Sequence, residues 1–243
     1  MKYYLYVSDA KVDMLFPQVP HEVKKKVATE WKLDLKVLGM SRRTEVDTED
    51  TRFARLDAVV AFVREFGSVG SADEPLDYVS DTLEMRWGYL GGFGGKEMPL
   101  VYFGGQTDRT VVGLGGSARH VIGNVGLSTP YSHSAMPFLT TTLVKDLGLG
   151  LEEVHTHYNL ADPGHGYDAL TRRSKLTEGK FRDVDEKFVF EAVFAASVEM
   201  KGPAQTVEFL AKRLLHGLPK EFKYPPNVAN ILLGTPLYVA LAE

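Results

Sequence analysis

A glycine-rich stretch over residues 87–126 constrains the fold of this chain more than any other feature. Twelve of the 23 glycines fall inside it, and two apolar, β-rich runs lie between them, at residues 100–103 and 111–114. Glycine at this density lets the backbone approach a neighbouring strand or a ligand closely, because it carries no Cβ atom. The two runs predict a β-hairpin that turns across residues 105–109. The sequence leaves open whether this backbone lies close to a neighbouring strand or to a ligand.

The composition is typical of a soluble globular protein. Hydrophobic residues make up 44% of the 243 residues and charged residues 25%, which is close to the average for such proteins. The net charge of −4 argues against a general nucleic-acid-binding protein, which usually carries a basic surface. The absence of cysteine excludes disulfides, thiolate metal sites and thiol catalysis. No apolar run reaches the ~20 residues of a membrane helix and no secretory signal is recognisable, so we expect a cytoplasmic protein without membrane contact.

Hydrophobic periodicity predicts three helices. Apolar residues recur at helical spacing over residues 52–66, over residues 206–216 and from residue 21 to about residue 31. The last of these helices is expected to give way to a strand over residues 33–40, where apolar and polar residues alternate.

Further strands are predicted from alternating or continuous apolar runs. They are expected over residues 2–7, 83–90 and 188–198, with one or two closing strands within residues 230–241. Strands outnumber helices, and they occur in local runs without strict β-α-β alternation. We therefore predict a single α+β domain over residues 1–243, in which a mostly antiparallel or mixed sheet carries a few packed amphipathic helices.

A polar cluster follows the predicted hairpin and is the first candidate for ligand binding. Gly115 and Gly116 precede Ser117, Arg119 and His120. A serine after a glycine pair can cap a short helix, whose first N–H groups bind anions, and the two basic side chains add donors. The alternative interpretation is a glycine bulge with a capped helix and a surface arginine.

A second polar group follows the first predicted strand. Residues 12–16 lead to two prolines, so we expect this connection to be extended. Asp9, Lys11 and Asp13 alternate along it and would face one side of an extended chain. They form either a polar rim at the end of the strand or a solvated loop with a local ion pair. Together, the two groups predict a set of ligand-binding residues: Gly115, Gly116, Ser117, Arg119, His120, Asp9 and Lys11.

Three histidines in the second half of the chain suggest a metal site. His155 and His157 flank one residue of a predicted strand, so both imidazoles would face the same side. His165 follows with Asp162 in the segment DPGHG. A divalent metal held by these residues could lower the pKa of a bound water to about 7 and generate a nucleophile for hydrolysis. The alternative is that they are ordinary strand and loop residues, because an H-x-H pair also arises by chance.

Three segments resemble motifs of a known family: KYYLYVSDAKVDMLFPQVP at the start, LGGSARHVIG in the centre and LLGTPLYVAL near the end. They are similar to an uncharacterised family of bacterial proteins, found mainly in actinobacteria. No activity is established for that family, so no catalytic residue can be carried over from it, and the cofactor stays unknown. It implies a link to bacterial conflict or signalling systems. The matching positions are Tyr4, Asp9, Lys11, Gln18, Gly115, Gly116, Ser117, His120, Gly234, Pro236 and Tyr238.

The residues thus favour a binding module for a small molecule, anionic or nucleotide-like, or for a protein partner. A metal-dependent hydrolase that uses His155, His157 and His165 is the alternative, and a purely structural role is the third hypothesis. Whether the protein is an enzyme stays open at this point.

Overall fold

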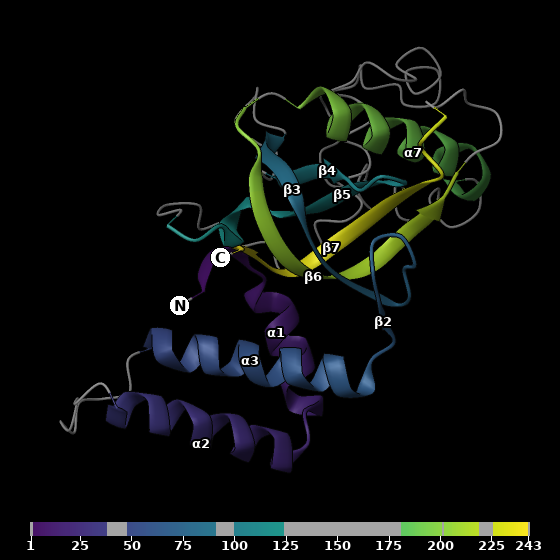
Figure 1. The fold of residues 1–243 in the computed structure, drawn as a ribbon. Helices are drawn as coiled ribbons and strands as arrows, with labels where there is room; N and C mark the ends of the chain where they lie inside the picture. Colours follow the sequence, from purple (N-terminus) through teal and green to yellow (C-terminus); the bar gives the residue numbers. More distant parts are fainter. Residues whose placement is uncertain are drawn as a thin grey trace, which may run out of the picture.

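A computed structural model describes residues 2–37, 48–90, 100–123, 181–200, 202–218 and 226–242. These residues form an α+β fold with a mixed sheet, as predicted. Helices α1 (Asp9–Leu15), α2 (His21–Val37) and α3 (Thr48–Phe66) lie on one side of the strands, and α7 (Phe181–Glu199) lies on the opposite side (Figure 1). No helix among the described residues is long and apolar enough to span a bilayer.

Five strands close into a small barrel. β3 pairs with β4, β4 with β5, β5 with β7 and β7 with β6, and β6 returns to β3. β1 extends the sheet beside β7, and β2 pairs with the start of β3. The strands of the described residues are β1 (Tyr3–Val7), β2 (Val69–Gly70), β3 (Tyr78–Leu90), β4 (Leu100–Gln106), β5 (Thr110–Ser117), β6 (Gln205–Gly217) and β7 (Asn230–Leu241).

Alternate residues of these strands fill the barrel interior, as the two-residue period of a strand requires. Phe103, Leu114 and Phe209 are fully buried there. The residues between them face outward. Helices cover those of two apolar clusters, whereas Thr82, Glu84 and Arg86 of β3 are exposed. Tyr102 belongs to the cluster that α7 covers, and Tyr238 belongs to the cluster that α1 and α3 cover. The barrel therefore has an apolar core inside and two apolar layers outside.

The predicted hairpin is confirmed, since β4 and β5 pair antiparallel. The alternation predicted for residues 83–90 is also confirmed, and β3 begins earlier, at Tyr78. Helix α3 ends at Phe66 as predicted and begins before the predicted residue 52. The closing segment 230–241 forms the single strand β7.

Two segments were assigned the wrong secondary structure. Residues 188–198, predicted as a buried strand, lie in helix α7, and residues 206–216, predicted as a helix, form strand β6. The first segment is apolar almost throughout, so periodicity alone does not distinguish a buried helix from a buried strand. In the second segment, apolar residues recur at the spacing of a helix and also at the spacing of a strand. This segment forms a strand because its backbone pairs with β3 on one edge and with β7 on the other.

Two N-terminal predictions were also wrong. The connection after β1 is not extended, because Asp9–Leu15 forms α1 and Phe16–Gln18 adds a 3-10 turn. Pro17 lies in the first turn of that short helix, where its missing N–H costs nothing. Helix α2 continues to Val37, so the strand predicted from residue 33 is absent over that part.

The glycines of the hairpin serve contacts within the protein. A Cβ atom on Gly104 would lie 2.7 Å from Cα of Ser197 in α7. A Cβ atom on Gly113 would overlap the hydroxyl of Tyr102, and one on Gly116 would overlap the hydroxyl of Tyr6. The close approach predicted from glycine density is thus made by the barrel to its own helix and tyrosines. The glycines of residues 91–95 lie outside the described residues.

Candidate functional site

The carboxyl ends of β1 and β5 meet along one edge of β7. β5 runs parallel to the first part of β7, up to the pair Leu114 and Gly234, and β1 runs antiparallel to its last part, from Tyr238 onward. After β5 the chain forms a 3-10 turn, Ala118–His120, and Val121 then bridges to Tyr6 of β1. Residues that follow β1 and residues that follow β5 are therefore neighbours in space.

Asp9 is the centre of a polar cluster at this point. It is the first residue of α1, and Arg52 of α3 donates from Nε and Nη2 to its two carboxylate oxygens, at 2.7 and 2.9 Å. Nδ1 of His120 lies 3.4 Å from Oδ2 of Asp9. Burial acts to raise the pKa of the Asp9 carboxyl, but its interactions with His120 and Arg52 outweigh burial and hold the pKa below its ordinary value.

His120 is held between Asp9 and its own neighbour in sequence. Nε of Arg119 donates to Nε2 of His120 at 3.1 Å. Arginine has only donors, so Nε2 must carry a lone pair, and the ring proton is on Nδ1, which faces Asp9. The imidazole is 6% exposed and packs edge-on against the ring of Tyr6. The contacts therefore hold the ring in one orientation, between Asp9 and Arg119.

Lys11 occupies the other side of the cluster. Its Nζ donates to Oγ of Ser8 at 3.2 Å and to the carbonyl oxygen of Pro236 at 3.0 Å. Both acceptors are neutral. Burial lowers the pKa of Lys11 to about 8. The ammonium group is therefore still charged at neutral pH, in an environment that disfavours the charge.

Tyr6 links the two sides. Its side chain is completely buried, and its hydroxyl makes no hydrogen bond of good geometry to a described residue. Burial raises the pKa of Tyr6 well above its ordinary value, and the nearby Ser8 side chain and the Arg119 charge offset only part of this rise. The hydroxyl is thus a protonated donor next to the cluster. We call Ser8, Asp9, Lys11, Arg52, Arg119 and His120 the Asp9 cluster.

Four of the predicted ligand-binding residues belong to the Asp9 cluster: Asp9, Lys11, Arg119 and His120. Gly115 and Gly116 are buried in β5, outside this cluster, and their predicted role in ligand binding stays a prediction. Ser117 makes no side-chain cap, and the three-residue turn after it is too short to supply a helix N-terminus for an anion.

Arg52 was missed by sequence reasoning, although a signal was present. Asp9 and Asp13 lie one turn apart on α1, and Arg52 and Arg55 lie at similar spacing on α3. Arg55 pairs with Asp13 at 2.8 Å, just as Arg52 pairs with Asp9. Two acidic residues on one helix and two basic residues at similar spacing on another predict that the two helices are adjacent. This signal was missed because the segment around Asp9 was predicted to be extended and not helical.

The predicted metal ligands His155, His157 and His165 lie outside the described residues. Within the part of the chain that the structure describes, no group of three or more histidine, aspartate or glutamate side chains could hold a metal ion. Because the three predicted ligands are not among these residues, the metal-dependent alternative stays a prediction.

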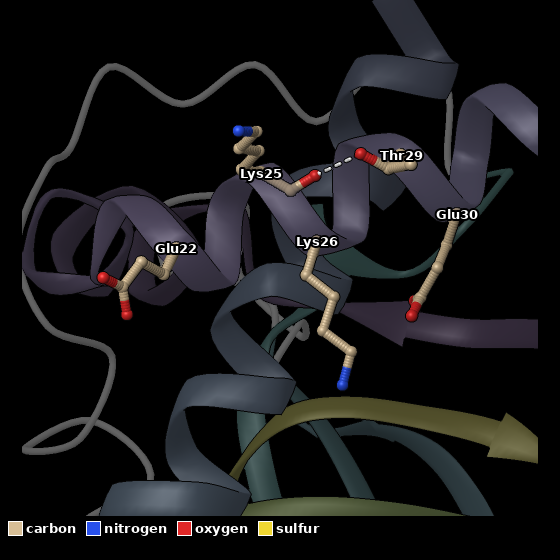
Figure 2. Close-up of a pocket in the computed structure, with 5 residues that line it drawn as sticks. All are labelled: Glu22, Lys25, Lys26, Thr29 and Glu30. Carbon is tan, nitrogen blue, oxygen red and sulfur yellow. Dashed lines mark hydrogen bonds between the residues drawn. The ribbon is translucent and has the colours of Figure 1, made fainter.

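An open pocket on α2 lies away from the Asp9 cluster. It is lined by Glu22, Lys25, Lys26, Thr29 and Glu30, all from one helix. Figure 2 shows that the charged side chains point in different directions, and the hydrogen bond drawn there joins the Thr29 hydroxyl to the Lys25 carbonyl of the same helix, at 2.8 Å. Because no groups converge on a common point, this surface is a solvated helix face.

Comparison with known proteins identifies the family. Residues 2–243 match a family described as a family of unknown function (DUF7019). The chain belongs to DUF7019. No curated protein and no solved structure with which it was compared matches it. Membership confirms the resemblance carried by the three motifs, and it assigns no activity to this DUF7019 protein.

We expect Asp9 to stabilise this DUF7019 protein at neutral pH and to lose that effect in acid. Because folding lowers the pKa of Asp9, the stabilisation is present above the ordinary aspartate value of about 4 and disappears as the pH falls through the folded-state pKa. Asp9→Asn should therefore lower the free energy of unfolding by about 1 kcal/mol at pH 7, as for a partly exposed charged pair.

Urea denaturation at neutral pH and at about pH 3 measures this difference. Asp13→Asn is the control, because the Asp13 side chain is 60% exposed and its ion pair with Arg55 should contribute less. An Asp9→Asn loss of the same size at both pH values would contradict the role of the carboxylate charge.

Proposed function

We propose that this protein binds a small anionic molecule at the Asp9 cluster. One observation carries the proposal: the buried ammonium group of Lys11 donates only to two neutral oxygens among the described residues, those of Ser8 and Pro236. The nearby Asp9 carboxylate is already bound by Arg52 through two hydrogen bonds. No carboxylate of the described residues therefore pairs with Lys11, and an anion would balance its charge.

Lys11 is the strongest support within the cluster. A buried ammonium group whose hydrogen bonds go to neutral oxygens is destabilised relative to water, and an anion beside it removes that penalty. Two of its three N–H groups are used by Ser8 and Pro236. The third has no acceptor among the described residues and would donate to an oxyanion.

The cluster suits several anions. A phosphate or sulfate presents oxygens to lysine and arginine donors, and a nucleotide-like ligand would bring its phosphate to the same groups. A protein partner could supply a carboxylate side chain instead. A ligand-binding role agrees with the link to bacterial conflict or signalling systems that the family resemblance implies.

Thermal unfolding in the presence of sulfate, phosphate and adenosine monophosphate tests the proposal. We expect a saturable rise in melting temperature, because a ligand at about a hundredfold excess over its dissociation constant stabilises the folded state by about 2.7 kcal/mol. For a chain of this length that corresponds to at least about 5 °C. Lys11→Met should lose most of the rise.

Lys25→Met is the matched control, because Lys25 is an exposed lysine on α2 and should leave the rise unchanged. Sodium chloride at equal ionic strength separates binding from screening. Sulfate also stabilises proteins by exclusion from their surface, and this effect should be the same in all three proteins. An equal rise in the wild type and in Lys11→Met would therefore contradict the proposed site.

A further inference from the structure

We propose that Ser8 and Lys11 form a nucleophile and base pair that accepts an acyl group from a small carboxylic ester. The inference goes beyond anion binding, because it assigns a reaction to the Asp9 cluster. Anion binding uses the charged form of Lys11, whereas the reaction uses its neutral form. Either one can therefore fail in an experiment without the other.

The first observation is the contact between the two side chains. Lys11 follows Ser8 by three residues, which is about one turn at the start of α1. Nζ of Lys11 lies 3.2 Å from Oγ of Ser8, within the hydrogen-bond distance that joins a nucleophile to its base. The same S-x-x-K spacing joins a serine nucleophile to a lysine in several acyl-transfer enzymes.

The second observation is that the Ser8 side chain does not cap the helix. Ser8 occupies the N-cap position of α1, where a serine ordinarily accepts a hydrogen bond from a backbone N–H of the first turn, yet it makes no such bond. Its backbone is held firmly, since its N–H donates to the carbonyl oxygen of Leu237 at 2.8 Å and its own carbonyl oxygen accepts from Lys11 and Val12. The hydroxyl is thus fixed in position and faces Lys11.

Lys11 has the properties of a general base. A base must be able to take up and release a proton near neutral pH. Burial lowers the pKa of Lys11 to about 8, and no carboxylate of the described residues pairs with it. About a tenth of the amine is therefore neutral at pH 7 and about nine-tenths at pH 9. The carbonyl oxygen of Pro236, 3.0 Å from Nζ, fixes the direction of the amine.

The other titratable groups of the cluster are separated from this pKa. Asp9 of α1 pairs with Arg52 of α3, and its pKa lies below the ordinary value of about 4. Tyr6 of β1 stays protonated, because burial raises its pKa. Arg119, which follows β5, bonds to His120. A change in reaction rate centred near pH 8 would therefore report the titration of Lys11.

Tyr6 supplies a donor beside the nucleophile. Its hydroxyl is completely buried and makes no hydrogen bond of good geometry to a described residue. The Ser8 side chain lies close enough to offset part of the rise that burial causes in the pKa of Tyr6. When Ser8 attacks a carbonyl carbon, negative charge develops on the carbonyl oxygen, and a protonated hydroxyl in a buried site stabilises that charge.

The reaction balances without a cofactor. The neutral Nζ of Lys11 takes the proton of the Ser8 hydroxyl while Oγ bonds to the carbonyl carbon. The bond to the leaving alcohol then breaks, and the ammonium group gives its proton to that alcohol. In the second half Lys11 takes a proton from water, whose oxygen bonds to the acyl carbon, and returns it to Oγ as the acyl bond breaks. One ester and one water become one carboxylic acid and one alcohol.

Acetylation by p-nitrophenyl acetate tests the proposal in the wild type. A small ester is used because Ser8 is buried next to the partly exposed side chains of Asp9 and Lys11. The reaction is stopped with acid, and peptide mass spectrometry locates the acetyl group. Ser71 is the internal control, because it is exposed and its hydroxyl accepts from the backbone N–H of Glu74. The buffer contains no sulfate or phosphate, since an anion beside Lys11 keeps it charged.

We expect the acetyl group on Ser8, at a rate that rises about tenfold relative to Ser71 between pH 7 and pH 9, as Lys11 loses its proton. Acetylation of Ser8 that is no faster than that of Ser71, or whose excess over Ser71 does not change with pH, would overturn the inference. This measurement needs no variant, so it does not depend on the folding of one.

Lys11→Arg is the test variant, because arginine keeps the positive charge and the donors but does not release a proton. At pH 9 it should slow the acetylation of Ser8 by at least about a hundredfold, the usual contribution of a general base. Lys25→Arg on α2 is the matched control and should leave the rate unchanged. An unchanged rate in Lys11→Arg would overturn the inference.

Tyr6→Phe should slow the same reaction by about tenfold or more, while its melting temperature stays close to that of the wild type. A purely structural role of the hydroxyl would not separate these two readouts. A rate equal to that of the wild type would contradict the assignment of Tyr6 as the donor to the oxyanion.

Discussion

Replacing Gly113 with alanine is expected to destabilise the protein by about 3 kcal/mol, at the upper end of what overpacking a core usually costs. The new Cβ atom would overlap the hydroxyl of Tyr102 and lie 2.8 Å from its Cζ and 3.0 Å from Cγ1 of Val193. Tyr102 and Val193 are completely buried between the barrel and α7, and Gly113 is buried as well.

Tyr102 cannot move aside, because its hydroxyl is fixed by hydrogen bonds. It lies 2.7 Å from Oγ of Ser197, to which it donates its single proton, and the carbonyl oxygen of Val193 lies 3.3 Å away. Ser197 in turn donates to the carbonyl oxygen of Val112 in β5, at 3.2 Å. Relief of the overlap therefore requires either the loss of this network or a shift of α7 away from the barrel.

Urea denaturation measures the loss, and Gly88→Ala is the control. A Cβ atom on Gly88 meets nothing within 4 Å, so this substitution should change stability by less than about 0.5 kcal/mol. Amide hydrogen exchange should show faster opening of α7 in Gly113→Ala. If both alanine variants are equally stable, the close approach at Gly113 is not what holds α7 in place.

Gly116→Ala is expected to cost about 2 kcal/mol, and removal of one hydroxyl should recover most of that loss. The new Cβ atom would overlap the Tyr6 hydroxyl and lie 2.9 Å from its Cζ. Because this hydroxyl makes no hydrogen bond of good geometry to a described residue, Tyr6→Phe alone should change stability little. In the double variant Gly116→Ala with Tyr6→Phe, the hydroxyl that the new Cβ atom would overlap is absent.

Tyr102→Phe provides the comparison for Tyr6→Phe. Both tyrosines are completely buried and both point at a glycine of β5. Loss of the Tyr102 hydroxyl breaks its contact with Ser197 and should cost about 1–2 kcal/mol. A double-mutant cycle between Gly116 and Tyr6 measures their coupling. A coupling near zero would mean that Gly116 is not required by Tyr6, and the interpretation of this glycine as a ligand contact would return.

The local sequence pattern was sufficient to predict secondary structure in segments whose apolar residues follow a single spacing. The hairpin of β4 and β5, the alternation along β3 and the end of α3 at Phe66 follow from the spacing of apolar residues within each segment. The α+β class follows from the same spacing, because it requires only the number and order of such segments.

Tertiary structure determined the secondary structure of segments whose apolar residues fit both a helix and a strand, or show no periodicity. β6 has apolar residues at helical spacing, yet its backbone pairs with β3 and β7 and so closes the barrel. Residues 188–198 of α7 are almost all apolar, and their helical form is evident only from the layer that they pack on β4, β5 and β7. Backbone pairing and burial are non-local, so a single segment does not reveal them.

The Asp9 cluster was likewise predicted only in part from the sequence, and the rest of it depends on the tertiary structure. The residue types and their neighbours identified Asp9, Lys11, Arg119 and His120 as candidates, since charged groups beside glycine and strand ends indicate binding. Their assembly with Arg52 depends on β7, which pairs with β5 along its first part and with β1 along its last. That arrangement brings the ends of two distant strands together, with α3 packed beside them, and it arises from hydrogen bonds between strands more than a hundred residues apart in the sequence.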